Sequence, residues 1–392
     1  MGRRVVITGL GVISPVGVGR EEFWNNLIKG KSGISEVTLF DTSKFRRHYA
    51  GEIKNFNPSR FMPSKIIKFF GRASQLAISA TKLALEDASL TVKEVRGKQI
   101  SIVIGVTIPE DRVIDFSSEM LLTKNMDNIT KKVLLNIFAP AVSRNVGYFL
   151  GFKGNNLLAP CACAAGNYAL GYGFDLVKRG ESDMAIVGGA EALSRLAFQG
   201  FQRLYAMAPK QCTPFDKNRK GMMLGEGAGI FILEELGHAL ERGAQIYSEV
   251  LGYGISSDAY HMTIPKQDGV RKAMQKALNN AGVSPDDIDY ISAHGTGTSA
   301  NDKTEVGAIK ELFGARYKSI PVSAIKSMLG HCMGAAPALE TVVCCLALRD
   351  QIVPPTINFT TPDPECDIDC VPSQARKVEV KTILNNSFAF GG

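Results

Sequence analysis

Long apolar runs are missing from this chain of 392 residues, and tryptophan and histidine are scarce. No apolar stretch approaches the roughly 18 residues needed to cross a bilayer, and the segment after Met1 lacks the apolar core of a signal peptide. Gly2 would invite N-myristoylation, but Val6 stands where that motif needs Ser or Thr. We therefore expect a soluble, cytoplasmic chain that works without a membrane.

Cysteine is also too rare to build a disulfide scaffold. The chain has 8 cysteines, and their spacings do not form paired zinc knuckles. Most of them are expected to be small buried hydrophobic residues. We predict no metal site.

Blocks of like charge are absent as well. The formal net charge is +7, but the Lys and Arg residues are spread along the chain, so we expect no nucleic-acid partner. One local exception is Lys65, Lys68 and Arg72, whose spacing of i, i+3 and i+7 predicts a single helical face. Such a face is either a solvated surface or a docking site for an acidic partner.

Short runs rich in Val and Ile alternate with longer helical patterns. Three runs are typical of buried strands, at Arg4 to Gly9, Ile100 to Gly105 and Met184 to Gly188. Two longer segments are predicted as amphipathic helices, at Ser74 to Leu90 and Asn167 to Arg179. The alternation indicates an α/β architecture in which helices cover sheets.

Two internal similarities divide the chain into halves. Val6 to Ser14 resembles Glu249 to Ser257, and each is predicted as a strand followed by Gly-x-Gly. Leu157 to Gly180 resembles Pro321 to Asp350, and each is predicted as a strand, a glycine-bearing turn and a helix. We therefore predict two similar halves, residues 1–245 and 246–392.

The first Gly-x-Gly also imitates a dinucleotide-binding fingerprint. Gly9 and Gly11 follow a predicted strand, but Ser14 replaces the third glycine and no acidic residue follows at the proper distance. The repetition in the second half favours a duplicated fold over an NAD site.

One cysteine is distinguished by its position. Cys163 lies between a predicted strand ending at Pro160 and a predicted helix starting near Ala164, so its sulfur would face unpaired N–H groups at the positive helix end. Such a position lowers the pKa of a thiol from about 8.5 and raises its thiolate fraction. Taken alone, a cysteine in this setting is more often inert and buried than catalytic.

Two of the 5 histidines lie in glycine-rich turns downstream. His294 opens His-Gly-Thr-Gly-Thr, and His331 closes the segment Lys-Ser-Met-Leu-Gly-His. A nucleophilic cysteine needs a histidine nearby, so we predict that Cys163, His294 and His331 act together. The remaining histidines lie in less informative contexts: His48, His238 and His261.

Over essentially its whole length, the chain resembles the β-ketoacyl-acyl carrier protein synthases, closest to the synthase I/II type. Besides the Cys and the two His, the resemblance rests on Gly188-Gly189-Ala190-Glu191, Pro214-Phe215-Asp216, Gly225-Glu226-Gly227-Ala228-Gly229, Asp302-Lys303-x-Glu305, Pro354-Pro355-Thr356-Ile357-Asn358 and Asn386-Ser387-Phe388-Ala389-Phe390-Gly391-Gly392. It implies a thiolase-like fold, whose two duplicated halves stack as five α-β-α-β-α layers. The first half would carry the nucleophile and most of a dimer interface, and the second half both histidines.

The resemblance implies an acyltransferase of the EC 2.3.1 class that performs a decarboxylative Claisen condensation. Cys163 would hold the acyl chain as a thioester, while His294 and His331 stabilise the enolate left when a malonyl group loses CO2. Backbone N–H groups of Cys163 and Phe390 would form the oxyanion hole, and Phe388 and Phe390 the gate between the acyl pocket and the malonyl site. No cofactor is implied, because the substrates are carried on phosphopantetheine.

Further residues receive supporting roles from the same resemblance. Lys326 would support the histidine pair, and its positive charge would disfavour a protonated imidazole. Glu305 and Asp302 would belong to a network behind the catalytic residues. Thr296 and Thr298 would hydrogen-bond the phosphopantetheine arm.

The implied partner is acyl carrier protein, which is acidic and so suits the basic face of Lys65, Lys68 and Arg72. A homodimer is expected, with a heterodimer of related ketosynthase-like subunits as the alternative. Acyl chain length, saturation and the pathway, whether fatty acid, polyene or polyketide, stay open because ordinary apolar side chains line such pockets.

The chain departs from the family pattern at three places. Cys161 stands where the family has Thr or Ser, and Pro337 is tolerated only in the first turn of a helix. The family continues after Phe-Gly-Gly with a terminal strand, so we expect that the natural protein has residues beyond Gly392.

Rival interpretations remain within and outside the fold. A thiolase would need a second cysteine where this chain has Phe388 to Gly392, and a chain-length factor would lack the nucleophile Cys163. A synthase of the third type pairs its cysteine with one His and one Asn. Outside the enzymes, the chain would be a non-catalytic subunit that docks acyl carriers.

Overall fold

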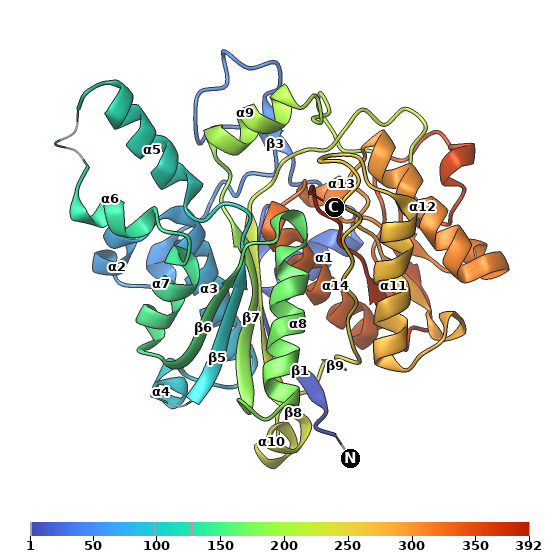
Figure 1. The fold of residues 1–392 in the computed structure, drawn as a ribbon, viewed down its shortest axis with the longest axis horizontal. Helices are drawn as coiled ribbons and strands as arrows, with labels where there is room; N and C mark the ends of the chain where they lie inside the picture. The colour runs from blue at the N-terminus through green and yellow to red at the C-terminus, as the bar shows by residue number, and fades with distance from the viewer. Residues whose placement is uncertain (1, 98, 126, 128, 392) are drawn as a thin grey trace.

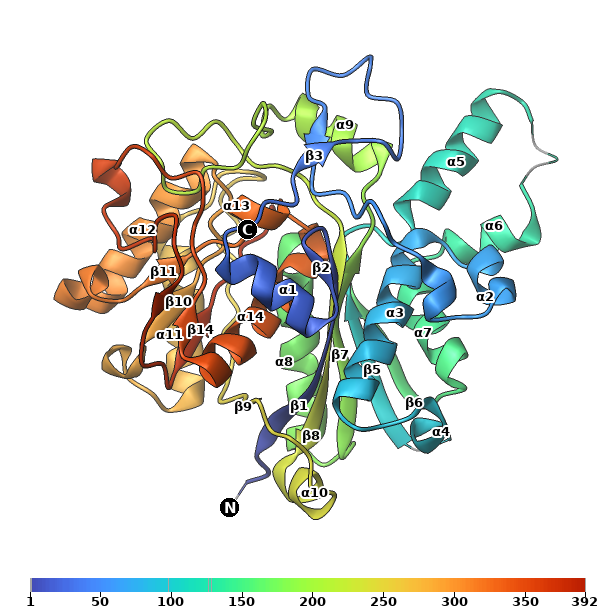
Figure 2. The same ribbon diagram turned by 180° about the vertical axis from the view of Figure 1, so that it is seen from behind.

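Five stacked layers make up the computed structural model, which describes residues 2–97, 99–125, 127 and 129–391 (Figures 1 and 2). The first layer holds α3 (Arg72–Asp87) and α7 (Ala141–Leu150), and the second is a 7-stranded sheet. The third layer holds α8 (Ala165–Lys178) and α14 (Ala336–Asp350). A 3-stranded sheet and then α11 (Gln267–Ala281) and α12 (Ser299–Phe313) complete the stack, as a thiolase-like fold requires.

The large sheet has the order β2-β1-β8-β7-β5-β6, with β9 paired to β1. Its strands β5, β6 and β7 run parallel, whereas β8 is antiparallel to both of its neighbours. The bounds are β1 (Val5–Ser14), β2 (Gly17–Val18), β5 (Gln99–Gly105), β6 (Lys153–Ala159), β7 (Met184–Glu191), β8 (Gly227–Glu235) and β9 (Ser248–Glu249). The three strands and two helices expected from the alternation are therefore confirmed.

The central strands are apolar on both faces because helices cover both sides. In β5, Ile102 and Ile104 pack toward α3 and α7, whereas Val103 between them packs toward α8 and α14. The small sheet is wholly parallel, in the order β11-β10-β14, and the core on its far side is formed with α11 and α12. Its bounds are β10 (Tyr290–Ser292), β11 (Val322–Ser323) and β14 (Ile383–Asn385).

Shorter elements surround this stack. They comprise α1 (Arg20–Ile28), α2 (Ser64–Phe69), α4 (Val92–Val95), α5 (Asp111–Leu122), α6 (Lys131–Asn136), α9 (Arg195–Arg203), α10 (Leu236–Glu241), α13 (Lys326–Leu329) and the hairpin-like pairs β3 (Ser35–Glu36) with β4 (Tyr49–Ala50) and β12 (Ile352–Val353) with β13 (Arg376–Lys377). Helices α5 and α6 project from the body of the first half (Figure 1). None of the helices in the described part of the chain combines the length and hydropathy needed to span a bilayer.

The similarity of Leu157 to Gly180 with Pro321 to Asp350 is confirmed. After β6, the chain passes Ala162 at φ 45° and enters α8, and before α14 it passes Met333 at φ 49°. Both are left-handed conformations at non-glycine residues, which proteins keep mainly where the surrounding structure and function require them. Pro337 lies in the first turn of α14, as expected.

The similarity of Val6 to Ser14 with Glu249 to Ser257 holds only in part. Where a strand was expected from Glu249, β9 ends at that residue, and residues 250–259 form neither strand nor helix. The Val250 N–H still donates to Val5 of β1, but within the described residues no strand pairs with the rest of this stretch, and a strand needs a neighbour to satisfy its backbone groups. Gly9 and Gly11 serve packing: a Cβ on Gly11 would lie 1.9 Å from the carbonyl oxygen of Ala80 in α3.

Candidate active site

The catalytic candidates lie on turns that follow the carboxyl ends of strands. His294 follows β10, the Lys326 to His331 turn follows β11, and Phe388 follows β14. Because these three strands are parallel, their carboxyl ends share one edge of the sheet. Cys163 reaches the same place from β6 of the large sheet, and a cavity of about 580 Å³ is lined by this cysteine, both histidines and Phe388.

The two imidazoles pack edge-to-face at the wall of this cavity. Their ring centroids are 5.3 Å apart with an interplanar angle of 83°, and Phe388 packs edge-on against His294 at 5.7 Å. Both histidines are buried, and among the described residues neither Nδ1 has a hydrogen-bond partner. A neutral imidazole carries one N–H, so each ring can donate one hydrogen bond to a substrate oxygen.

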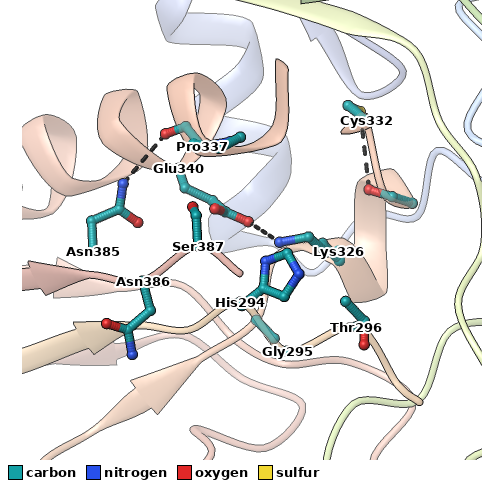
Figure 3. Close-up of polar contacts among 12 residues, drawn as sticks. His294, Gly295, Thr296, Lys326, Cys332, Pro337, Glu340, Asn385, Asn386 and Ser387 are labelled. Carbon is teal, nitrogen blue, oxygen red and sulfur yellow. Dashed lines mark hydrogen bonds and ion pairs between the residues drawn. The ribbon is translucent and has the colours of Figure 1, made fainter. Parts of the chain in front are cut away.

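A buried ion pair stands behind the imidazoles. The Lys326 ammonium group contacts the carboxylate of Glu340 in α14, and both side chains are almost fully enclosed (Figure 3). Burial first, and then the Lys326 charge, hold the pKa of both His294 and His331 well below the ordinary value of 6.5. The neutral imidazole expected beside Lys326 is therefore what the structure supports, although Lys326 makes its hydrogen bond to Glu340 and not to a histidine.

The expected low pKa of Cys163 is wrong. The side chain is 5% exposed, and burial raises the pKa of its thiol to about 12, despite an opposing contribution from the Lys326 charge. The helix end is close, since Cys163 lies in a 3-10 turn at Ala162–Ala164 just before α8, but burial outweighs that effect. The resting side chain is therefore a thiol and not a thiolate.

Two buried carboxylates hold the His294 turn in place. Glu305 accepts hydrogen bonds from the backbone N–H groups of His294 and Gly295, both at 2.9 Å. Asp302 accepts from the N–H groups of Phe215 at 2.8 Å and Gly297 at 3.2 Å. Gly297 has φ 77°, where an L side chain would be strained, so the glycine is required by the turn.

The remaining predicted residues of the cavity lie at its wall and mouth. Thr296 and Thr298 line the cavity, and their hydroxyl oxygens are 2.9 Å apart. Phe390 is 40% exposed and stacks on Phe201 of α9 at 5.9 Å, whereas Phe388 lies deeper against His294.

The single basic face expected for Lys65, Lys68 and Arg72 is wrong. Helix α2 ends at Phe69 and α3 begins at Arg72, so the three residues do not share one helix. Lys65 and Lys68 are exposed, but Arg72 turns inward and donates to the buried carboxylate of Glu226 at 2.6 and 2.7 Å. Arg72 therefore has a structural partner, and only the two lysines remain a surface pair.

Sequence reasoning missed Glu340, although a signal was present. Glu340 is the only acidic residue between Ala336 and Arg349, in an otherwise apolar helix, and a lone charge there needs a buried partner. It also missed the role of Asn386, which donates to Glu305 at 3.2 Å. Figure 3 shows Asn386 next to Ser387. Among the described residues, no group of three or more His, Cys, Asp or Glu is placed to hold a metal ion.

Comparison with known proteins agrees with this geometry. The protein-family model described as Beta-ketoacyl synthase, N-terminal domain, matches residues 2–239. The family model described as Beta-ketoacyl synthase, C-terminal domain, matches residues 247–360. A 3-oxoacyl-(acyl-carrier-protein) synthase 2 of Synechocystis sp. is 40% identical over 399 residues, covering 100% of this chain and 96% of its own.

Two solved structures are also similar. The ishigamide ketosynthase/chain length factor is 43% identical with a TM-score of 0.96, over 100% of this chain and 97% of its own. The second structure is described as a type II PKS acyl-carrier protein in complex with its ketosynthase bound to the hexaketide. Its matching chain is 34% identical with a TM-score of 0.91, and the match covers 100% of this chain and 98% of that one. The chain therefore belongs to the beta-ketoacyl synthase family and is an acyltransferase of fatty acid or polyketide synthesis.

Proposed function

We propose that Cys163 is the acyl-accepting nucleophile of this ketosynthase and that His294 and His331 form its enolate-stabilising pair. The observation that carries the proposal is the convergence of the buried Cys163 thiol and the two neutral imidazoles on one cavity. In the first step, the thiol sulfur attacks the thioester of an acyl-carrier protein. A neutral imidazole accepts the thiol proton and returns it to the departing phosphopantetheine thiolate, which leaves as a thiol.

The second step joins two carbon chains. Malonyl-carrier protein loses CO2, and the electron pair of the broken C–C bond becomes an enolate whose oxygen accepts hydrogen bonds from the two imidazoles. The enolate carbon attacks the Cys163 thioester, and the N–H groups of Cys163 and Phe390 form the proposed oxyanion hole. The Cys163 thiolate leaves and takes up a proton, and the product is a β-ketoacyl-carrier two carbons longer.

The surrounding groups are assigned positioning roles. Lys326 keeps the imidazoles neutral, so that each donates one N–H, while Glu305 and Asp302 hold the His294 turn. Thr296 and Thr298 line the cavity at a place suited to hydrogen-bond the phosphopantetheine arm. We propose no metal or redox cofactor, because neither step transfers electrons to an acceptor or needs a Lewis acid.

The nucleophile is tested by incubating the chain with an acyl-carrier protein and measuring intact mass and peptides. We expect one acyl adduct, located on Cys163 and released by hydroxylamine, as a thioester is. A chain that binds the carrier but shows no adduct would be a carrier-docking subunit without catalysis. An adduct on Cys161 in place of Cys163 would also contradict the proposal.

We propose that Lys65 and Lys68 form part of the docking surface for acyl carrier protein. Both are exposed on α2, and Phe69 beside them is 39% exposed, which offers an apolar contact within a basic surface. The related type II PKS structure contains a ketosynthase with its acyl-carrier protein, which supports this class of partner. The chain is proposed to meet its carrier in the cytoplasm.

Charge reversal at these lysines tests the surface. Lys65→Glu with Lys68→Glu is expected to weaken carrier binding about tenfold at low salt, because two attractions become repulsions. The difference should vanish near 1 M salt, where the Debye length is about 3 Å. Titration by fluorescence anisotropy at several salt concentrations measures both effects.

The matched control reverses two exposed lysines elsewhere, Lys29→Glu with Lys377→Glu, which changes net charge equally. If both double variants weaken carrier binding equally, the effect comes from the net charge of the chain, which would contradict a local docking surface. Unchanged affinity of the Lys65 and Lys68 variant at low salt would contradict it as well.

We propose that a second ketosynthase-like subunit pairs along β6. This edge strand pairs only with β5 among the described strands, and its first five residues are exposed. An open strand edge of this length usually pairs or is covered. A second copy of this chain would make a homodimer, and a related subunit a heterodimer, as the combination named in the ishigamide ketosynthase/chain length factor suggests.

A further inference from the structure

Cys163 has buried apolar neighbours besides the other catalytic candidates. It belongs to a buried apolar cluster with Leu193, Phe198, Met207, Met222, Leu224 and Met333. Thioether side chains are flexible and polarizable, so a cluster rich in methionine can repack around a bound apolar chain. Met222 of this cluster also lines the catalytic cavity, as does Phe201, which packs against the cluster. The methionine cluster therefore borders the site and offers apolar surroundings to an acyl chain on Cys163.

Helix α9 supplies the aromatic wall of this region. Phe201 lines the catalytic cavity and stacks on Phe390 at its mouth. Phe198 lies three residues earlier, on the same helical face, and is 0% exposed. It is the buried residue of α9, whose start is capped by Ser194. One helix thus places one phenyl ring at the entrance of the site and another at its interior.

Behind Phe198 stand two more aromatic rings. Phe40 packs edge-on against it, with ring centroids 5.5 Å apart, and Phe45 packs against it at a tilt, with centroids 5.8 Å apart. Both of these rings also line a groove of about 1050 Å³ between α5, α9 and residues 39–46, together with Phe116 and Leu122 of α5. Phe198 is therefore the side chain between the methionine cluster around Cys163 and the rings that border this open space.

We infer that Phe198 is a specificity-determining residue, which closes the inner end of the space for the acyl chain and limits how long that chain becomes. The inference rests on the proposed acylation of Cys163. A ring packed against two other rings cannot turn aside without losing this packing, so it acts as a stop. In hydrophobic pockets one methylene group changes discrimination roughly 10- to 200-fold, so removal of a phenyl ring is well within measurement.

The experiment compares acylation of Cys163 by carriers bearing saturated chains of increasing length, followed by intact mass. For Phe198→Ala and the milder Phe198→Leu, we expect the rate ratio of the longest chain to the shortest to rise at least ~10-fold. Short chains should be transferred at close to the unaltered rate. In full elongation assays, products should lengthen by one or more rounds of condensation.

The matched control is Phe231→Leu, because Phe231 in β8 is also 0% exposed but belongs to the core between the large sheet and α8. Phe198→Leu keeps an apolar side chain, so it provides a folded variant if Phe198→Ala does not fold. An unchanged length profile in folded Phe198→Leu, or an equal change in Phe231→Leu, would overturn the inference. The absence of any Cys163 adduct in the unaltered chain would count against the proposed nucleophile and not against Phe198.

Discussion

Replacement of Cys163 by Gln is expected to lower the rate of condensation at least ~10³-fold, while decarboxylation of malonyl-carrier protein continues. The variant has no thiol to hold an acyl chain, so the enolate finds no thioester to attack. The histidine pair and the Lys326 and Glu340 ion pair are untouched, so the groups that stabilise the enolate remain. Mass measurement of the carrier should show acetyl-carrier protein and no β-ketoacyl product, with CO2 released.

The matched control is Cys161→Ser, two residues before the nucleophile. Cys161 is half-buried and lines the same cavity, but the proposed steps assign it no proton or bond. We expect this variant to condense within a few-fold of the unaltered rate. Continued elongation by Cys163→Gln would refute the mechanism, and loss of decarboxylation along with condensation would show that Cys163 also shapes the malonyl site.

The convergence of Cys163, His294 and His331 on one cavity was predictable because its signals are local. Cys163 lies in a strand-turn-helix segment, and His294 and His331 lie in glycine-rich turns that their own sequences specify. Parallel strands then bring the ends of such segments to one edge, so the residues meet although they are far apart in the chain.

The predictions that failed concern features that depend on contacts between residues distant in sequence. The pKa of Cys163 rises because side chains from several segments enclose it, and no local pattern reports that burial. Arg72 turns inward because Glu226, distant in sequence, is its buried partner. Periodicity placed Arg72 with Lys65 and Lys68, but the break between α2 and α3 moved it to another helix.

The segment after Glu249 shows the same limit for secondary structure. Its Gly-x-Gly pattern matches that of β1, yet only β1 lies between neighbours, pairing with β8 and β9 within the described residues. Strand formation therefore depends on which backbone groups are available to pair, and sequence similarity alone does not supply them.

Removal of the buried ammonium group in Lys326→Met is expected to move the acid limb of the activity profile to higher pH. The Lys326 charge helps to keep the pKa of both His294 and His331 low, so without it the pKa of each imidazole rises. At a mildly acidic pH, more of the enzyme then carries a protonated imidazole and a disturbed hydrogen-bond pair at the enolate. The measurement is the pH dependence of kcat/KM for condensation, together with malonyl decarboxylation.

Stability is the competing explanation, because breaking a buried ion pair leaves a charge unpaired and costs about 3–5 kcal/mol. Burial raises the pKa of Glu340 to about 7 even with Lys326 present, so without the ammonium group its carboxyl becomes protonated near neutral pH and the cost falls. The double variant Lys326→Met with Glu340→Leu removes both charges and should restore thermal stability while keeping the shifted acid limb. If the acid limb stays in place in both folded variants, Lys326 does not control the charge of the histidines, and its role is confined to packing with Glu340.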